Sequence, residues 1–168
     1  MAKSLLVSAF VATVVFCFSA APTSAHDKLY VEGYVYCDPC RVAFQTPLCS
    51  PIPQNKVFLT CTSRLNGSVT FKTSGVTNEK GVYSLAVQGD HEDDICEVEL
   101  GKSSASYCYV PFKTTNKARV LLTRNFGAVT PVRSVSALGF MTPVSHKRCA
   151  HVLLNMGFLP HDAHMLYA

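Results

Sequence analysis

The residues of this sequence most able to do chemistry are its eight cysteines, two of which form a short CxxC motif. The stretch Glu32–Arg41 reads EGYVYCDPCR and places Cys37 and Cys40 three positions apart. A CxxC motif can form a redox couple, half of a zinc site or the ends of two structural disulfides. A thioredoxin-type motif is followed by a helix, and a zinc site needs a second CxxC or an HxxxH. Neither pattern is found here, so we expect structural disulfides.

The densest group of acidic residues is the run Gly89–Asp94 (GDHEDD), which also contains His91. Carboxylate oxygens are the ligands that Ca²⁺ prefers, so a cation site is one interpretation of this run. The run lacks the spacing of an EF-hand loop, which has acidic residues at alternate positions, a glycine and a distant glutamate. We therefore interpret it as a solvated turn between two strands.

Histidines are the other candidates for catalysis or metal binding. They are His26, His91, His146, His151, His161 and His164. The sequence contains no GxSxG nucleophile elbow and no HExxH motif. His161 and His164 could bind a metal weakly, but an exposed polar tail is the better interpretation. We expect no catalytic residue, no metal site and no cofactor, and hence no enzyme.

The N-terminal segment predicts secretion. Lys3 precedes an apolar run, Leu5–Phe18, and small residues lead up to Ala25, after which we expect signal peptidase to cut. The apolar run is shorter than the roughly 20 residues of a membrane span, and no second run of that length follows. We therefore expect an extracellular or cell-wall protein without a membrane span, whose mature domain occupies 26–168.

Removal of the signal segment takes away Cys17 and leaves seven cysteines. In a secreted chain, this number implies a disulfide framework with one thiol left over. Six cysteines can pair in about 15 ways, and the spacing does not choose among them.

Apolar and polar residues alternate after the expected cleavage site, which is typical of β-strands. Strands are expected over 29–38, 57–62, 68–73, 83–87, 96–100, 107–111 and 118–122. A proline-containing loop spans 38–55, and turn residues separate the later strands. We expect an all-β fold, a small antiparallel β-barrel or sandwich of about seven strands over 28–123. An irregular tail, 124–168, would follow, with Cys149 as its tether.

Two further features bear on modification and partners. Asn66-Gly67-Ser68 is the N-x-S/T sequon of the chain, and we predict N-glycosylation at Asn66, although Asn-Gly is equally typical of a hairpin turn. The charged residues are scattered, whereas a nucleic-acid-binding protein carries a basic stripe, so we expect no nucleic-acid partner. Tyr30, Tyr34 and Tyr36 share one face of the first strand and could anchor an interface or pack under the tail.

The stretch that contains the CxxC motif resembles the E-G-x-V-Y-C-D-x-C-R signature of the Ole e 1-like pollen protein family. The matching residues are Glu32, Gly33, Val35, Tyr36, Cys37, Asp38, Cys40 and Arg41. The similarity continues through 77–83, 89–93, 95–98 and 138–140, and the order of six cysteines also fits. The anther-expressed pollen-tube branch and the olive-type allergens look closest.

This resemblance implies the disulfides Cys37–Cys108, Cys40–Cys149 and Cys61–Cys96. Cys49 has no counterpart in the family pattern. It could be a free thiol, an intermolecular bridge that makes a disulfide dimer, or a competitor that reshuffles with Cys40, and we favour a free, partly exposed thiol.

The resemblance also implies a function in pollen development, hydration or pollen-tube growth, and allergens are frequent in the family. We expect a non-enzymatic protein that binds a receptor-kinase ectodomain or a cell-wall component. The alternatives are a protein that modifies wall polysaccharide, which would need paired carboxylates along a groove, and a structural wall protein cross-linked through tyrosines.

Overall fold

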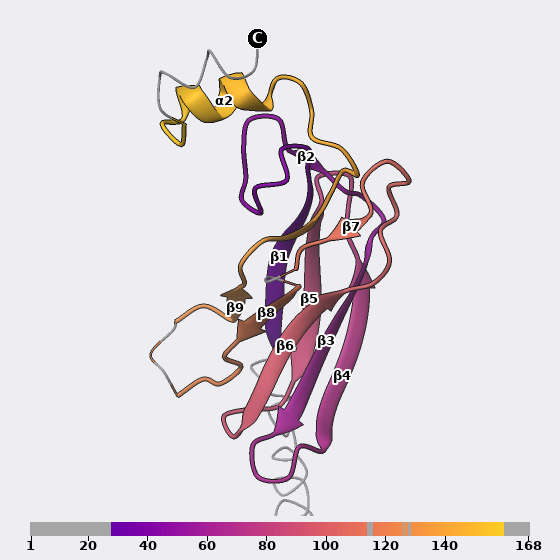
Figure 1. The fold of residues 1–168 in the computed structure, drawn as a ribbon. Coiled ribbons are helices and arrows are strands. Elements are labelled where there is room, and N and C mark those ends of the chain that lie inside the picture. Colours follow the sequence, from indigo (N-terminus) through magenta and orange to yellow (C-terminus); the bar gives the residue numbers. More distant parts are fainter. Residues whose placement is uncertain (1–27, 114–115, 126, 128, 160–168) are drawn as a thin grey trace, which may run out of the picture.

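Two β-sheets with a shared apolar core make up the described part of the chain (Figure 1). The computed structural model describes residues 28–113, 116–125, 127 and 129–159. The expected signal segment with Ala25, and the histidine pair His161 and His164, lie outside the described residues.

β1 (Lys28–Asp38) is the central strand of the first sheet and has different partners along its two halves. Its first half pairs antiparallel with β5 (Val82–Gln88) and parallel with β9 (Val132–Ser134). Its second half pairs antiparallel with β2 (Ser50–Pro51) and parallel with β10 (Leu138–Met141). The CxxC segment at the end of β1 therefore lies beside segments that are far away in the sequence.

The second sheet is antiparallel throughout. Its strand order is β4 (Val69–Val76), β3 (Lys56–Ser63), β6 (Asp94–Leu100) and β8 (Lys117–Val120). Buried residues alternate with more exposed ones along β3 and β5, because successive side chains of a strand point to opposite faces. This alternation is the pattern from which the sequence predicts the strands.

The core lies between the two sheets. Fully buried side chains of β1, β3, β5 and β6 pack in one cluster that includes Leu29, Val31, Val35, Val57, Leu59, Val87 and Val98. Among the described residues, no ladder of hydrogen bonds joins the second sheet to the first, so the sheets form a sandwich and not a closed barrel. The prediction of an all-β sandwich is confirmed.

The described part of the chain after residue 124 is not the irregular tail that the sequence suggests. It adds β9 and β10 to the first sheet, and all four residues of β10 are buried. A strand that is covered on both faces has a continuous apolar run without alternation, which is why the pattern misses it. Both strands run parallel to β1, so the first sheet is mixed where a purely antiparallel one is expected.

Two shorter segments also differ from the expectation. The strand expected at 107–111 is reduced to β7 (Val110–Pro111), which pairs with β10. The proline-containing loop includes β2, whose two residues pair with β1. Segments this short carry too few residues for a periodic signal.

A short helix, α2 (Cys149–Asn155), follows β10 and lies at the end of the sandwich away from the β3–β4 turn (Figure 1). Its first residue is covalently tied to Cys40, in the loop that follows β1. Among the helices that the structure describes, none has the length and apolar character needed to cross a membrane.

Candidate functional site at the Cys37–Cys108 end of the sandwich

The two cysteines of the CxxC motif are bonded to different partners. Cys37, in β1, is joined to Cys108, and Cys40 is joined to Cys149, the pairs that the family resemblance implies. Both disulfides span large sequence separations, 71 and 109 residues. The motif thus fastens two distant segments to the end of β1 and does not form a redox couple of its own.

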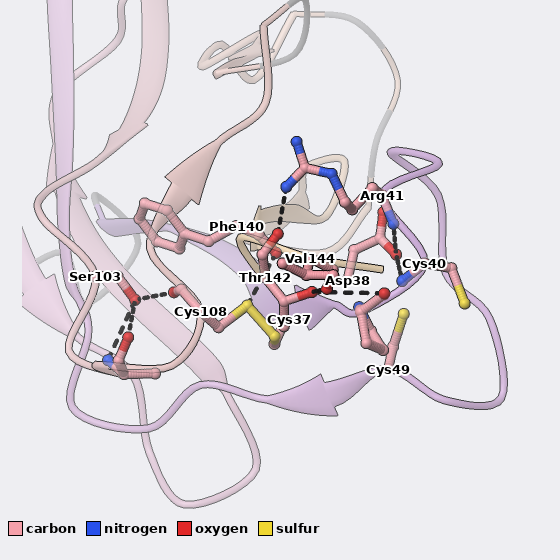
Figure 2. Close-up of a disulfide and its surroundings, with 12 residues drawn as sticks. Cys37, Asp38, Cys40, Arg41, Cys49, Ser103, Cys108, Phe140, Thr142 and Val144 are labelled. Carbon is pink, nitrogen blue, oxygen red and sulfur yellow. Dashed lines mark hydrogen bonds between the residues drawn. A yellow bond between two sulfur atoms is a disulfide. The ribbon is translucent and has the colours of Figure 1, made fainter. Parts of the chain in front are cut away.

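The side chain of Asp38, between those cysteines, organises the loop that follows β1 (Figure 2). It is fully buried, and its Oδ1 accepts hydrogen bonds from the backbone N–H groups of Cys40 (2.8 Å) and Arg41 (2.9 Å). Its Oδ2 accepts from the N–H groups of Val42 (2.7 Å) and Ala43 (2.8 Å). A carboxylate that accepts four bonds satisfies donors that would otherwise be buried without partners. The signature aspartate is therefore a structural residue.

Arg41 connects this loop to the C-terminal segment. Its backbone is in the left-handed region (φ 60°), as is that of Ala43 (φ 59°). Its guanidinium donates to the carbonyl oxygen of Thr142 (Figure 2) and, at 3.2 Å, to that of Pro143. Asp38 thus fixes the first residues of this loop, and Arg41 ties them to the C-terminal segment.

The tyrosines of β1 pack beneath the C-terminal half of the chain. Tyr36 is buried against Phe112 and Met141, and the ring of Tyr34 stacks on it with 6.0 Å between centroids. Burial raises the pKa of Tyr36 to about 12, and nearby Cys49 adds to this shift. Of the two roles considered for these tyrosines, packing within the protein applies to Tyr34 and Tyr36. Tyr30, by contrast, is 36% exposed.

Cys49 is free and half-buried. It packs against the apolar cluster of Tyr36 and Met141. Its sulfur accepts a hydrogen bond from the Thr46 N–H at 3.2 Å.

The acidic run between β5 and β6 binds protein groups. Asp90 accepts hydrogen bonds from the Thr123 hydroxyl (3.0 Å) and from the N–H groups of Arg124 (3.1 Å) and Glu92 (2.9 Å). Burial by itself would raise the pKa of Asp90, but the bonds from Arg124 and Thr123 bring it below its usual value. The run therefore ties this turn to the segment after β8.

Asp94 joins the same turn to β4 through its Oδ2. This oxygen accepts a hydrogen bond from the Thr70 hydroxyl (2.6 Å) and contacts His91 Nδ1 at 2.8 Å. These two hydrogen bonds, with Thr70 the larger cause, lower the pKa of Asp94. The other ring nitrogen of His91, Nε2, lies 3.2 Å from the carbonyl oxygen of Gln88.

One group of three candidate metal ligands occurs within the described residues. It consists of Cys61, His91 and Cys96, whose ligand atoms lie within 4.8 Å of one another. The two sulfurs are bonded to each other in the third disulfide, which joins directly paired positions of β3 and β6. Sulfurs in a disulfide cannot act as thiolate ligands. This group is therefore a disulfide with His91 close to it and not a metal site.

A groove with a volume of about 660 Å³ lies next to the Cys37–Cys108 disulfide, between the end of β6, β7 and β10. Its apolar lining includes Leu100, Phe112 and Phe140, and its polar lining includes Glu99 and Lys102. An apolar floor with a few polar groups at its border is the usual composition of a ligand-binding site.

The wall of this groove is held by hydrogen bonds as well as by the disulfide. The Ser103 hydroxyl donates to the Cys108 carbonyl oxygen at 2.6 Å (Figure 2). Next to it, the Ser104 N–H donates to Oδ1 of the buried Asn55 at 3.0 Å, and the Gly101 N–H donates to the Lys56 carbonyl oxygen at 2.8 Å. The loop between β6 and β7 is thus held by hydrogen bonds near its start, at Gly101, and near its end, at Cys108.

Two exposed tyrosines flank Cys108, at positions where the sequence predicts a strand but no functional role. The exposed fractions of Tyr107 and Tyr109 are 58% and 56%, whereas Cys108 is fully buried. Tyr109 lines the groove. The buried cysteine is the signal that could have found them, because neighbours of an inward-pointing residue in an extended segment point outward.

Comparisons with known proteins match this chain over most of its length. Residues 27–157 match the family model described as pollen protein Ole e 1 like. The "Olee1-like protein" of Betula pendula is 37% identical over 96% of this chain and 98% of its own length. "Pollen allergen Che a 1" of Chenopodium album is 40% identical, covering 91% and 94% of the two chains. "Anther-specific protein LAT52" of Solanum lycopersicum is 37% identical, covering 92% and 98%.

A solved structure agrees with these matches. The crystal structure of the major plantain pollen allergen Pla l 1 superposes with a TM-score of 0.65 and 31% sequence identity, covering 71% of this chain and 97% of that one. The names of these relatives describe pollen allergens and anther-specific or pollen-related proteins, not enzymes. With the sandwich fold and the signature residues in place, the chain belongs to the Ole e 1-like pollen protein family.

Proposed function

We propose that this pollen-associated protein is secreted and acts outside the cell by binding, without catalysis. Its partner would be a receptor-kinase ectodomain or a cell-wall component, and its role would lie in pollen development, hydration or pollen-tube growth. The observation that carries this proposal is the groove beside Cys37–Cys108, with Tyr109 exposed along it. The signal-like N-terminus and the three disulfides support secretion.

The groove has the properties that favour recognition. Tyrosine is enriched among residues that dominate binding energy, because it combines a large apolar ring with a polar hydroxyl. The disulfide and the bonds of Ser103 and Ser104 hold the groove wall in place before a partner binds. A pre-organised wall lowers the entropic cost of association.

The residues around the groove favour binding over hydrolysis of wall polysaccharide. Glycoside hydrolases use two carboxylates that flank the bond to be cleaved. Glu99 is the one carboxylate among the described residues that line the groove, and it forms an ion pair with Lys117 at 3.3 Å.

The proposal is tested by measuring binding of the purified mature protein to soluble pollen receptor-kinase ectodomains and to solubilised pollen-wall polymers. Tyr109→Ala should weaken saturable binding about 30-fold, the effect of losing a hot-spot side chain. Tyr30→Ala is the matched control, because Tyr30 is also partly exposed but lies on β1, away from the groove. Equal binding by the Tyr109→Ala variant and the wild-type protein would exclude the groove, and retention on insoluble wall material alone would favour the structural alternative.

We also propose that Asn66 carries an N-linked glycan. Asn66 is exposed in the turn between β3 and β4, where Gly67 has a φ of +71°, and its Oδ1 accepts hydrogen bonds from the N–H and hydroxyl of Ser68. Protein isolated from pollen should therefore gain electrophoretic mobility on treatment with a peptide N-glycosidase. An Asn66→Gln variant expressed in plant cells should migrate like the treated protein, and unchanged mobility would contradict the assignment.

A further inference from the structure

A free thiol and a disulfide share one hydroxyl group in the loop after β1. The Oγ1 atom of Thr46 lies 3.6 Å from Sγ of the free Cys49 and 3.9 Å from Sγ of Cys40. Cys40 is bonded to Cys149, the first residue of α2. The free sulfur of Cys49 and the Cys40 sulfur of the Cys40–Cys149 disulfide therefore contact the same hydroxyl, and Figure 2 shows no bond between Cys40 and Cys49.

The local backbone holds the free thiol in this position. The Cys49 N–H donates to the Thr46 carbonyl oxygen at 2.9 Å, which closes a turn. The Thr46 N–H donates back to Cys49 Sγ at 3.2 Å. These two bonds together fix the Cys49 side chain relative to the Thr46 hydroxyl. Cys49 is half-buried, so its position is set by packing as well as by these bonds.

We propose that Cys49 exchanges with the Cys40–Cys149 disulfide. The Cys49 thiol loses its proton to solvent, and its sulfur attacks Sγ of Cys40. A Cys40–Cys49 bond forms as the Cys40–Cys149 bond breaks, and the electron pair of the broken bond leaves on the Cys149 sulfur, which then takes up a proton. One disulfide and one thiol are present before and after, so the step needs no external oxidant or reductant.

The exchange changes how the C-terminal segment is attached. In the described structure, residues 142–159 contact the loop after β1 through the disulfide and through several weaker contacts. The His146 N–H donates to the Pro39 carbonyl oxygen at 2.9 Å, and the rings of Phe44 and Phe158 lie 4.6 Å apart. With Cys149 released, only noncovalent contacts of this kind, among them those of Arg41 and the hydrogen bonds of Thr142 to Asp38 and Pro39, join the described residues of the two segments. The exchanged form therefore presents Cys149 as a thiol on a segment that can detach.

The test is non-reducing peptide mapping of the purified, oxidised mature chain. The protein is incubated at about pH 8, where thiol attack is fast, then treated with an alkylating reagent and digested without reduction. We expect two species, one with alkylated Cys49 and a Cys40–Cys149 bond, the other with alkylated Cys149 and a Cys40–Cys49 bond. Alkylation at Cys49 alone, after a day of incubation, would overturn the proposal.

Two variants distinguish exchange with Cys49 from other causes of Cys149 alkylation. Cys49→Ser should abolish alkylation of Cys149, and persistence of that alkylation would show that another thiol or a reductant opens the bond. Cys149→Ser leaves Cys40 and Cys49 as the remaining pair near Thr46. This variant should form a Cys40–Cys49 bond in an oxidising glutathione buffer, and two free thiols would contradict the geometry. Hydrogen exchange of the α2 amides should be faster in Cys149→Ser than in Cys49→Ser.

Discussion

Gly33 leaves the space that the side chain of Tyr83 fills. A Cβ atom at Gly33 would lie 2.2 Å from the Tyr83 hydroxyl oxygen and 2.5 Å from its Cζ. The two residues are directly paired on β1 and β5, and Tyr83 is 2% exposed. The signature glycine is thus explained by packing of a buried ring.

Gly33→Ala should destabilise the protein by about 1–3 kcal/mol, the usual cost of overpacking a core. Tyr83→Phe removes a buried hydroxyl that has no hydrogen-bond partner among the described residues, so it should be neutral or stabilising. Urea unfolding of the two single variants and the double variant measures the coupling. The double variant should recover part of the loss, and strictly additive effects would contradict the packing explanation.

Gly139→Ala should separate β10 from β1, because the added Cβ would lie 2.4 Å from the Tyr36 carbonyl oxygen, a backbone atom that cannot rotate away. We expect a loss of more than about 2 kcal/mol in unfolding free energy. Gly101→Ala is the control, since the nearest atoms there are 3.3 Å away. Equal stabilities of the two variants would show that the parallel pairing tolerates a side chain at position 139.

Asp38→Asn should cost about 2–4 kcal/mol, because an amide has one acceptor oxygen for four converging N–H groups and leaves buried donors unsatisfied. Asp93→Asn is the control, an exposed change in the acidic run that should stay within about 0.5 kcal/mol. Chemical unfolding at neutral pH checks both. A small effect at position 38 would mean that the four N–H groups find other acceptors when the loop reorganises.

Acid should destabilise the protein through Asp90 and Asp94, whose pKa values are lowered in the folded state. A carboxylate with a lowered folded pKa contributes stability above its unfolded pKa of about 3.9, and this contribution is lost as the pH falls through the folded value. Unfolding midpoints should therefore decline below about pH 4. Asp90→Asn and Asp94→Asn should each make this decline less steep. If the unfolding midpoints of both variants fall with acid as steeply as those of the wild-type protein, the lowered pKa values of Asp90 and Asp94 would be contradicted.

Removal of the Cys37–Cys108 disulfide, as a double serine variant, should cost about 4 kcal/mol, since it closes a 71-residue span. The matched variant at Cys61 and Cys96, with a span of 35 residues, should lose about 0.6 kcal/mol less in the chain-entropy description. Thermal and urea unfolding compare the two. The first variant should also lose groove binding, because Tyr109 is next to Cys108.

Much of the fold is visible in the sequence because its longer strands have one buried face. β3, β5, β6 and the first half of β1 alternate between more buried and more exposed positions, and their side chains therefore carry a period of two. The cysteine partners came from the family resemblance, since spacing alone leaves all pairings open.

The groove could not be predicted in the same way. Its lining comes from β6 of the second sheet, from β7 and the loop before it, and from β10, which reaches this place through its parallel pairing with β1. β10 is buried on both faces and has no periodic signal, so neither its existence nor its position beside Phe112 follows from local pattern.

The sequence by itself determined the class of protein, because alternation encodes a two-sided sheet and the CxxC signature is local. Tertiary structure decided what that signature does. Arg41 reaches Thr142 and Cys40 is bonded to Cys149, residues 101 and 109 positions away that lie beside this loop only when the chain is folded. Hydrogen bonds and sulfur contacts act over a few ångströms, and which distant residues come that close is set by the packing of the whole sandwich.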